Sequence, residues 1–277
     1  MSVTLADLDR REQAAGSGFF RRPVPGRLAA YVHSMVSYSE NGQRLTASIE
    51  MAPLVVPLII SFGDAFEIAL GRAPNADETY GTFTSGLYPG FVVINSTGRS
   101  QCIQVDFTPL GAYRFFGFPM SEIASRMVPV DDLGDVAFRS LRERLGEIND
   151  WDARLALVET FVAARLAKGP ANSPAMSWAW NTLLARGGDV RIKRIAEHLG
   201  WSRRHLAACF RKEIGIEPKA AARMVRFNRA AALAAEPRFD GWARIAAECG
   251  YADQSHLARE FHEFGGRTPT EWRADLR

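Results

Sequence analysis

The sequence predicts an α+β fold, with a strand-rich first half followed by an all-helical second half. Between residues 54 and 107, short apolar or alternating runs lie between turn-forming residues, which is typical of strands. From residue 192 onward the apolar residues follow helical spacing, and one pattern occurs twice. Residues 168–174 hold Gly, two Pro and small polar residues, which is typical of a linker. We therefore expect domains at 1–168 and 176–277, joined by a linker at 169–175.

The first half contains five apolar runs that predict strands. They lie at 54–62, 65–70, 81–88, 91–95 and 102–107. After Pro109 the spacing becomes helical, and predicted helices follow at 110–116, 120–127, 135–148 and 151–167. Strands followed by helices predict a small β-barrel or half-barrel with a helical appendage. The apolar face of the last helix could pack on the barrel or pair two protomers, and the sequence leaves both open.

The second half repeats one unit of two helices with a period of 50 to 51 residues. The first copy contains Ile192, Ile195, Ala196, Leu199, Gly200, Trp201, Leu206, Phe210, Gly215 and Pro218. The second copy contains Trp242, Ile245, Ala246, Cys249, Gly250, Tyr251, Leu257, Phe261, Gly266 and Pro269. In each copy a Gly can end the first helix, and Ser202 or Asp253 can cap the second. Two short helices around such a turn predict a helix-turn-helix.

Between the copies, residues 219–235 predict a third helix that would set the distance between the two units. Its expected buried line is Met224, Phe227, Ala231 and Ala234. Two tandem helix-turn-helix units can reach successive major grooves on one side of a duplex. Residues 171–277 carry 18 Lys and Arg against 12 Asp and Glu, whereas residues 1–170 carry 16 against 19. A basic excess on the duplicated half suits phosphate contacts, so double-stranded DNA is the expected partner.

The repeated residues, above all Gly250-Tyr251, Asp253, Ser255, Leu257, Arg259 and Phe261 followed by Gly266 and Thr268-Pro269, resemble the AraC/XylS family of transcription regulators. The resemblance covers about the last 100 residues. It implies a DNA-binding domain, preceded in many relatives by a cupin-like sensor domain with which the first half is compatible. It also implies that the chain can dimerise through the first half and, as an activator, contact RNA polymerase. Many relatives have an Arg where this chain has Ala208.

The expected DNA-contacting residues lie on the second helix of each unit. In the first unit they are Arg203, Arg204, His205, Ala207, Ala208 and Arg211. In the second unit they are Gln254, Ser255, His256 and Arg259. Guanidinium, amide and imidazole groups suit the donor and acceptor pattern of the major groove, and Arg204 and Arg259 are the preferred candidates for contacts near base edges.

The first half could bind a small-molecule effector, because barrels enclose ligands when their interior leaves room. The expected effector-binding residues are Phe62, Phe66, Arg72, Tyr80, Phe83 and Tyr88. In this reading Arg72 or Arg99 would orient an acidic effector. The alternative function is an architectural DNA-binding protein without an effector.

Enzyme activity is not expected. Residues 1–170 contain a single histidine, His33, which is too few for a metal-dependent cupin or for a catalytic triad. A DNA-repair methyltransferase with a similar DNA-binding part would need a four-Cys zinc site, and this chain has three dispersed cysteines. We therefore expect no metal, no cofactor and no catalytic residue. With no apolar segment long enough for a membrane span or a signal peptide, we expect a cytoplasmic protein.

Overall fold

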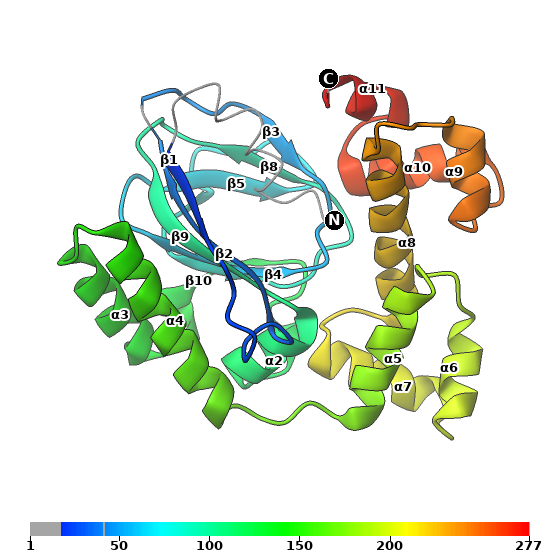
Figure 1. Ribbon diagram of the computed structural model, residues 1–277, viewed down its shortest axis with the longest axis horizontal. Helices are drawn as coiled ribbons and strands as arrows, with labels where there is room; N and C mark the ends of the chain where they lie inside the picture. Colours follow the sequence, from blue (N-terminus) through cyan, green and yellow to red (C-terminus); the bar gives the residue numbers. More distant parts are fainter. Residues whose placement is uncertain (1–17, 41, 277) are drawn as a thin grey trace.

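The computed structural model describes residues 18–40 and 42–276 and has two parts (Figure 1). The N-terminal part consists of two β-sheets and helices α2 to α4, and the C-terminal part consists of helices α5 to α11. The expected α+β class is therefore confirmed. The two sheets lie face to face in an open, jelly-roll-like arrangement rather than a closed barrel.

The larger sheet has six strands in the order β1-β2-β9-β4-β7-β10. Their bounds are Gly18–Arg22, Val32–Ser39, Gln101–Phe107, Val56–Ser61, Phe83–Ser85 and Met127–Pro129. The smaller sheet has the order β3-β8-β5-β6, with bounds Ser48–Glu50, Val92–Asn95, Phe66–Leu70 and Thr79–Tyr80. All pairings within both sheets are antiparallel.

The alternation of side chains along β9 divides the residues of the larger sheet between two environments. Ile103 and Val105 are fully buried in the core that includes the helices, whereas Cys102 belongs to the smaller cluster between the sheets. Gln104 shares the face of Cys102 because the two are separated by one residue. The space between the sheets is therefore lined by every second residue of the strands.

Three helices cover the outer face of the larger sheet. Helix α2 (Pro109–Phe116) begins at Thr108, whose hydroxyl accepts a hydrogen bond from the Gly111 amide, and ends at Gly117 with φ +79°. Helices α3 (Val136–Gly146) and α4 (Trp151–Lys168) follow. Leu155, Val158 and Val162 of α4 are buried in the core, so this face packs on the N-terminal part itself.

The C-terminal part contains the two expected helix-turn-helix units. Its helices are α5 (Pro174–Ala185), α6 (Ile192–His198), α7 (Arg203–Glu213), α8 (Pro218–Ala235), α9 (Trp242–Glu248), α10 (Gln254–Gly265) and α11 (Pro269–Ala274). Gly200 and Gly250 both have positive φ, 66° and 71°, and end the first helix of each unit. The predicted buried line of α8 is confirmed, since its four residues are at most 2% exposed.

The segment 120–127 differs from the expected helix. It forms a short 3-10 turn, η1 (Met120–Glu122), and then continues into strand β10. A second 3-10 turn, η2 (Val130–Leu133), follows directly. The apolar residues of this short segment fit either helical or strand spacing, and pairing of β10 with β7 decides between them. No helix among the described residues is long and apolar enough to cross a membrane.

The two parts share one continuous hydrophobic core. The main-chain amide of Ala52, in the loop after β3, donates a hydrogen bond to the Phe264 carbonyl at the end of α10 (2.9 Å). The Asn228 side chain on α8 donates to the Ala52 carbonyl at 2.9 Å. At the first unit, η1 and α2 contact α7, and the Ser173 amide of the linker donates to Glu213 of α7 (3.1 Å). The N-terminal part thus contacts both helix-turn-helix units.

Candidate nucleic-acid interface and interior cavity

Helices α7 and α10, the second helices of the two units, are here called the recognition helices. Each is fixed by two buried anchors: Leu206 and Phe210 in α7, and Leu257 and Phe261 in α10, all 0% exposed. Each also begins at the expected cap. The Ser202 hydroxyl accepts from the His205 amide (3.1 Å), and the Asp253 carboxylate accepts from the His256 amide (2.7 Å).

Most of the expected DNA-contacting side chains lie on exposed faces of these helices. Ala207 and His256 are only half-buried, whereas the others are exposed: Arg203, Arg204, His205, Ala208, Arg211, Gln254, Ser255 and Arg259. His205 also packs edge-on against Trp201, with ring centroids 4.5 Å apart. Arg211 forms an ion pair with Glu217 at the start of α8, so it is partly neutralised. Base contact by these residues stays a prediction.

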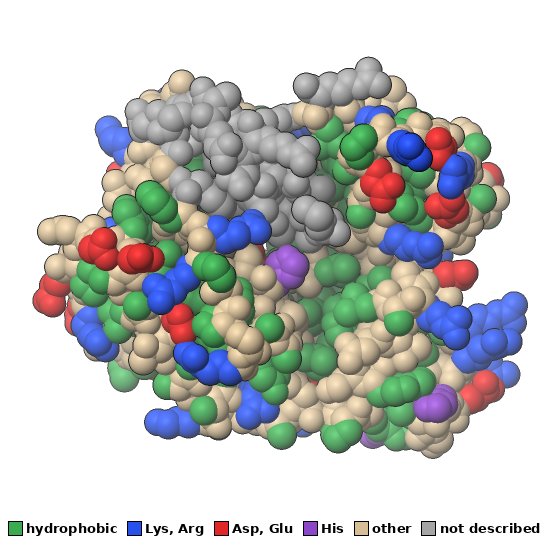
Figure 2. Space-filling view, viewed as in Figure 1, with side chains coloured by type: hydrophobic (Ala, Val, Ile, Leu, Met, Phe, Trp, Pro, Cys, Tyr) green, Lys and Arg blue, Asp and Glu red, His purple; other side chains and the backbone are tan. Residues whose placement is uncertain are grey.

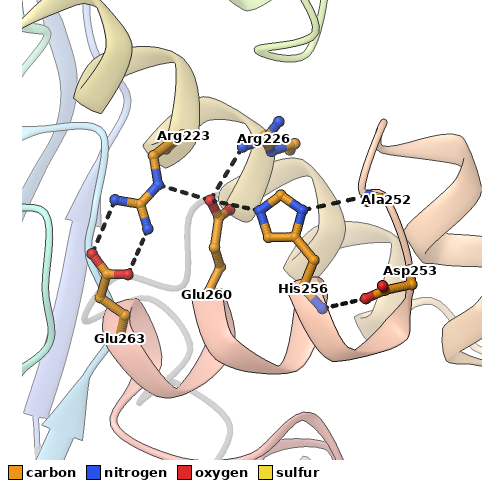
Figure 3. A network of polar contacts seen from close by, with 7 residues as sticks. All are labelled: Arg223, Arg226, Ala252, Asp253, His256, Glu260 and Glu263. Atoms are coloured by element: carbon orange, nitrogen blue, oxygen red, sulfur yellow. Dashed lines mark hydrogen bonds and ion pairs between the residues drawn. The ribbon is translucent and has the colours of Figure 1, made fainter.

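A buried ion network joins α10 to α8 (Figure 3). Glu260 of α10 has a side chain only 2% exposed, and its Oε1 accepts hydrogen bonds from Arg223 Nε (2.8 Å) and Arg226 Nη2 (3.1 Å). Arg223 also donates to Glu263, with 3.0 Å between Nη1 and Oε1. Hydrogen bonds to both glutamates raise the pKa of the Arg223 guanidinium. The network fixes the second recognition helix to the helix that connects the units.

His256 belongs to this network instead of projecting freely from the helix. Its Nδ1 accepts from the Ala252 amide (3.4 Å), and its Nε2 lies 3.7 Å from Glu260 Oε1 (Figure 3). Its ring also packs edge-on against Tyr251 at 5.1 Å. One step of helical spacing separates His256 from Glu260, which places both on the side of α10 that faces α8. Arg259, which is exposed, is therefore a better candidate for contact with a base than His256.

Basic side chains gather on the C-terminal part. Figure 2 shows Lys and Arg side chains at its outer edge, on the right of the view. A groove between the two units is lined by residues of α8 and α10 together with their neighbours. Its lining includes Lys219, Arg223, Arg226 and His256, together with Glu260, which pairs with both arginines. Because Glu260 neutralises part of the arginine charge, this groove by itself offers only a modest positive charge to the phosphate backbone.

The N-terminal part contains a cavity of about 90 Å³ between its two sheets. Three of the expected effector-binding residues line it: Phe66, Phe83 and Tyr88. Tyr80 does not line the cavity itself. It packs edge-on against Phe83, with ring centroids 5.9 Å apart, and against the hydrophobic cluster between the sheets.

Phe62 and Arg72 lie outside the cavity and correct the expectation. Pro57 and Ile59 of β4 face the cavity, so Phe62, of the opposite parity, faces α4 instead and contacts Trp151 and Arg154. Arg72 follows the end of β5 and forms an exposed ion pair with Glu78. Arg99 likewise pairs with Asp64 at the surface. The structure provides none of the expected cations at the cavity.

Sequence reasoning missed the polar wall of the cavity and the segment beside it. Gln104 and Glu50 line the cavity, and Gln104 donates to the buried Asp106 at 2.7 Å. The signal was present in β9, where Cys102, Gln104 and Asp106 alternate with apolar residues and so put polar groups on one buried face. Burial raises the pKa of Asp106, against the hydrogen bonds from Ser34 and Gln104 that lower it.

Residues 50–55 were also missed, and here they are called the docking segment. Glu50, Pro53 and Val55 line the cavity. Between them, Ala52 is bonded to Phe264 and Asn228, and the sulfur of Met51 lies against Gly265 of α10. A single short stretch therefore forms both a wall of the cavity and the contact with the second helix-turn-helix unit.

Comparison with known proteins identifies the duplicated half. Residues 195–275 match the helix-turn-helix domain family. No curated protein matches this chain.

The solved structures that resemble the chain fall into two groups. A transcriptional regulator with an AraC-type DNA-binding domain from Chromobacterium violaceum is 26% identical, with 37% of this chain and 92% of that chain covered and a TM-score of 0.35. The C-terminal domain of the response regulator AraT from Geobacillus stearothermophilus is 23% identical, covering 38% and 88%, with a TM-score of 0.36. ToxT from Vibrio cholerae O395 is 12% identical and covers 94% and 97%, with a TM-score of 0.45.

The matched range begins inside α6 and ends at α11, so it takes in both helix-turn-helix units and the helix that connects them. This range contains Gly200 and Gly250, which end the first helix of each unit, and the buried anchors of the two recognition helices. The C-terminal part of the chain therefore belongs to the AraC-type helix-turn-helix DNA-binding domains.

Proposed function

We propose that the chain is a sequence-specific transcription regulator whose DNA binding is controlled by a small molecule bound between the sheets of its N-terminal part. The main support for sequence-specific DNA binding comes from the two recognition helices. Each presents an exposed polar face while its buried anchors hold it to the core. Arg259, Gln254 and Ser255 offer donors and acceptors to base edges, as sequence reading requires. A purely architectural protein needs only the basic surface.

Control by a ligand is supported by the docking segment. Ala52 uses both its main-chain groups to bond α10 and α8, and its neighbours Glu50 and Pro53 line the cavity. A ligand that displaces this wall would alter the contact that holds the second recognition helix. A ligand can shift an equilibrium only through different affinities for the two states, and a shared wall supplies such a difference.

In this proposal residues 1–168 sense the ligand, 169–175 link the parts and 176–277 bind DNA. The chain acts in the cytoplasm by binding, without catalysis. As an activator it would contact RNA polymerase, and two protomers would associate through the N-terminal part.

Selection of bound duplexes from a random-sequence library by the full chain tests the proposal. Recovery of a consensus site with two separated blocks is the expected result, and recovery of unselected sequence at several salt concentrations would overturn it. Control by the N-terminal part is tested separately with Asn228→Ala, which removes the side-chain bond to Ala52. We expect operator affinity to change at least about threefold, with exposed Asn149→Ala as the matched control. Equal affinities of the two variants and wild type would favour the architectural alternative.

A further inference from the structure

Helix α5 and helix α6, the first helix of the first unit, enclose an open groove of about 460 Å³, here called the α5–α6 groove. Among the described residues, the titratable side chains of its lining are Arg186, Asp189, Arg191, Arg194 and His198. The rest of the lining consists of Trp178, Thr182, Val190 and Ile195. All of these residues precede the first recognition helix in the chain, so the groove is a surface separate from the faces that read bases.

The three arginines of this groove have no acidic partner. Arg186, Arg191 and Arg194 are exposed, and none of them forms an ion pair or a side-chain hydrogen bond with another described residue. Elsewhere in the C-terminal part, Arg211 and Arg244 are also exposed, but each pairs with a nearby carboxylate. Three guanidinium groups without a partner in one groove are suited to an anion from outside the chain.

Asp189, the one carboxylate that lines the groove among the described residues, does not neutralise the arginines. It lies against the turn of the second unit, since a Cβ atom added to Gly250 would be 3.0 Å from the Asp189 Cγ. It forms no ion pair with another described residue. Glu197 of α6 pairs with Lys193 (3.4 Å) and does not line the groove. Three arginines against one aspartate leave an excess of two positive charges, with His198 neutral.

The helices fix the arginines in place. Arg186 is the C-cap residue of α5, Arg191 is the N-cap residue of α6, and Arg194 lies in the first turn of α6. The rings of Trp178 and His198 stack between the two helices, with centroids 4.0 Å apart and an interplanar angle of 13°. Because the backbone on both sides of the groove is helical, the site is already formed before an anion binds.

The position of the groove favours the phosphate backbone of DNA as the partner. In helix-turn-helix docking the second helix enters the major groove, and the first helix crosses the backbone. Helix α6 is this first helix, and it lies at the outer edge of the C-terminal part, where Lys and Arg side chains gather (Figures 1 and 2). Val190 lines both the α5–α6 groove and the groove between the two units, to which Lys219 belongs. The unpaired arginines are therefore continuous with the space between the recognition helices.

We propose that the α5–α6 groove binds phosphate groups of the DNA backbone beside the block that α7 reads. This inference rests on the proposed function and assigns a second DNA-binding surface to it. A guanidinium group offers two parallel N–H donors to two phosphate oxygens, which makes arginine well suited to this ligand. Such contacts add affinity and fix the register of the protein on the duplex, but they carry no sequence information.

The salt dependence of binding tests the contact, with the full chain and the operator recovered by selection. Each lost phosphate contact should make the slope of log K against log salt concentration shallower by about 0.9, and should weaken binding at a fixed salt concentration at least about threefold. Arg191→Gln and Arg194→Gln should each show this effect, and the triple variant that also carries Arg186→Gln should show it most strongly. The base preference should stay that of wild type.

Lys193→Gln is the matched control for these variants. It removes the same charge from the same helix, but Lys193 pairs with Glu197 and does not line the groove. Its slope should stay close to that of wild type. Slopes of the arginine variants equal to that of Lys193→Gln would overturn the proposal.

Neutral backbone positions in the DNA locate the contact. Methylphosphonate groups replace the phosphates of the operator one at a time along both strands. At a phosphate held by the groove, this replacement should weaken binding of wild type at least about threefold. It should leave binding of the triple variant unchanged, because the protein partner of that phosphate is already absent. Equal losses for wild type and the triple variant at every phosphate would overturn the proposal.

An acidic protein segment would offer carboxylates to the same guanidinium groups. A hexaglutamate peptide is therefore titrated into the full chain by calorimetry without DNA. Peptide binding that depends on the three arginines, together with unchanged salt slopes on DNA, would assign the groove to a protein partner and overturn the DNA contact. All substituted side chains are exposed, so each variant should keep the wild-type circular dichroism spectrum and melting temperature.

The proposed function fails by a different measurement. Absence of a consensus operator overturns sequence reading, but a random-sequence duplex still reports the salt slopes, because phosphate contacts do not depend on sequence. Unchanged slopes with an intact consensus overturn only the role of the groove.

Discussion

Glu260 on the second recognition helix accepts hydrogen bonds from Arg226 of α8 at 3.1 Å and is almost completely buried in doing so. Arg223 donates to the same oxygen. A charged residue on the inner side of a recognition helix cannot read DNA, but it can set the angle at which the outer side is presented. The helix that connects the two units thus holds the second one by charge as well as by the apolar contacts of Phe227 with Phe261 and Phe264.

Glu260→Gln should lower the free energy of unfolding by about 1–3 kcal/mol, because two guanidinium groups lose a buried charged partner. Operator affinity should fall too, since α10 loses its fixed angle. Urea denaturation and binding titrations measure the two effects. Glu263→Gln is the matched control. Its side chain is 48% exposed, so its ion pair should contribute less than about 1 kcal/mol. A larger loss for Glu263→Gln than for Glu260→Gln would contradict the importance of the buried pair.

Arg259→Ala should weaken operator binding by about 1–3 kcal/mol and relax the preference at one base position, while leaving stability unchanged. Leu257→Ala should do the opposite, lowering stability by about 2–5 kcal/mol through a cavity at a fully buried site. Thermal melts combined with a panel of single-base operator variants separate the two effects. Exposed Arg139→Ala on α3 controls for the loss of one positive charge. If Arg259→Ala matches Arg139→Ala on every operator, α10 does not read bases through Arg259.

The two units should protect two blocks of DNA about one helical turn apart, roughly 10 bp or 34 Å. Insertion of about 5 bp between the blocks would rotate them to opposite sides of the duplex, and a connecting helix of 18 residues cannot follow. Affinity should then fall to the level of a single block. Insertion of about 10 bp keeps both blocks on one side of the duplex, but the distance exceeds the reach of α8, so affinity should fall in this case too. Hydroxyl-radical footprinting on these duplexes measures the outcome. Unchanged affinity after the 5-bp insertion would show that the units act independently.

The sequence predicted the C-terminal part almost completely, because its signals are local. Gly200, Ser202 and their counterparts mark turns and caps within a few residues, and the anchors follow helical spacing. The prediction succeeded less well for the cavity. Phe62 was expected inside, but strand parity and the position of α4, both settled by tertiary packing, turn it outward. The inward direction of His256 could not be predicted for a similar reason, since it depends on Glu260 and on the arginines of a helix about 30 residues earlier. Its contact with DNA stays a prediction.

The docking segment could not be predicted from local pattern. Residues 50–53 of this segment precede the predicted strand and have no strong strand or helix spacing, and Asn228, the partner of Ala52, lies 176 residues away in the chain. Only the assembled fold brings them together. Gln104 is an intermediate case. The alternation along β9 predicts which face of the strand its side chain lies on, but the orientation of its amide depends on Asp106, which accepts a hydrogen bond from Ser34 on a neighbouring strand.

The free energy of unfolding of Asp106→Asn, relative to that of wild type, should be higher at neutral pH than in acid. Burial is the first cause of the raised pKa of Asp106, whose ordinary value is 3.8. A carboxyl whose pKa is higher in the folded than in the unfolded state binds its proton more tightly when folded. Its contribution to stability is therefore fully present below pH 3.8 and is lost as the pH rises through the folded-state pKa. Asparagine does not titrate and can still pair with Gln104 and Ser34 through its amide oxygen and nitrogen.

The measurement is the free energy of unfolding of variant and wild type by urea at a series of pH values from about 4 to 8. The difference, variant minus wild type, should increase with pH and then level off above the folded-state pKa. Other titrating groups, such as Glu213, whose pKa burial also raises, contribute equally to both proteins and cancel. Exposed Asp132→Asn is the control and should give a difference that varies little with pH. If the Asp106→Asn difference is equally constant, or decreases with pH, the buried carboxyl is not opposed by its surroundings, because the sign of the slope depends only on which state binds the proton more tightly.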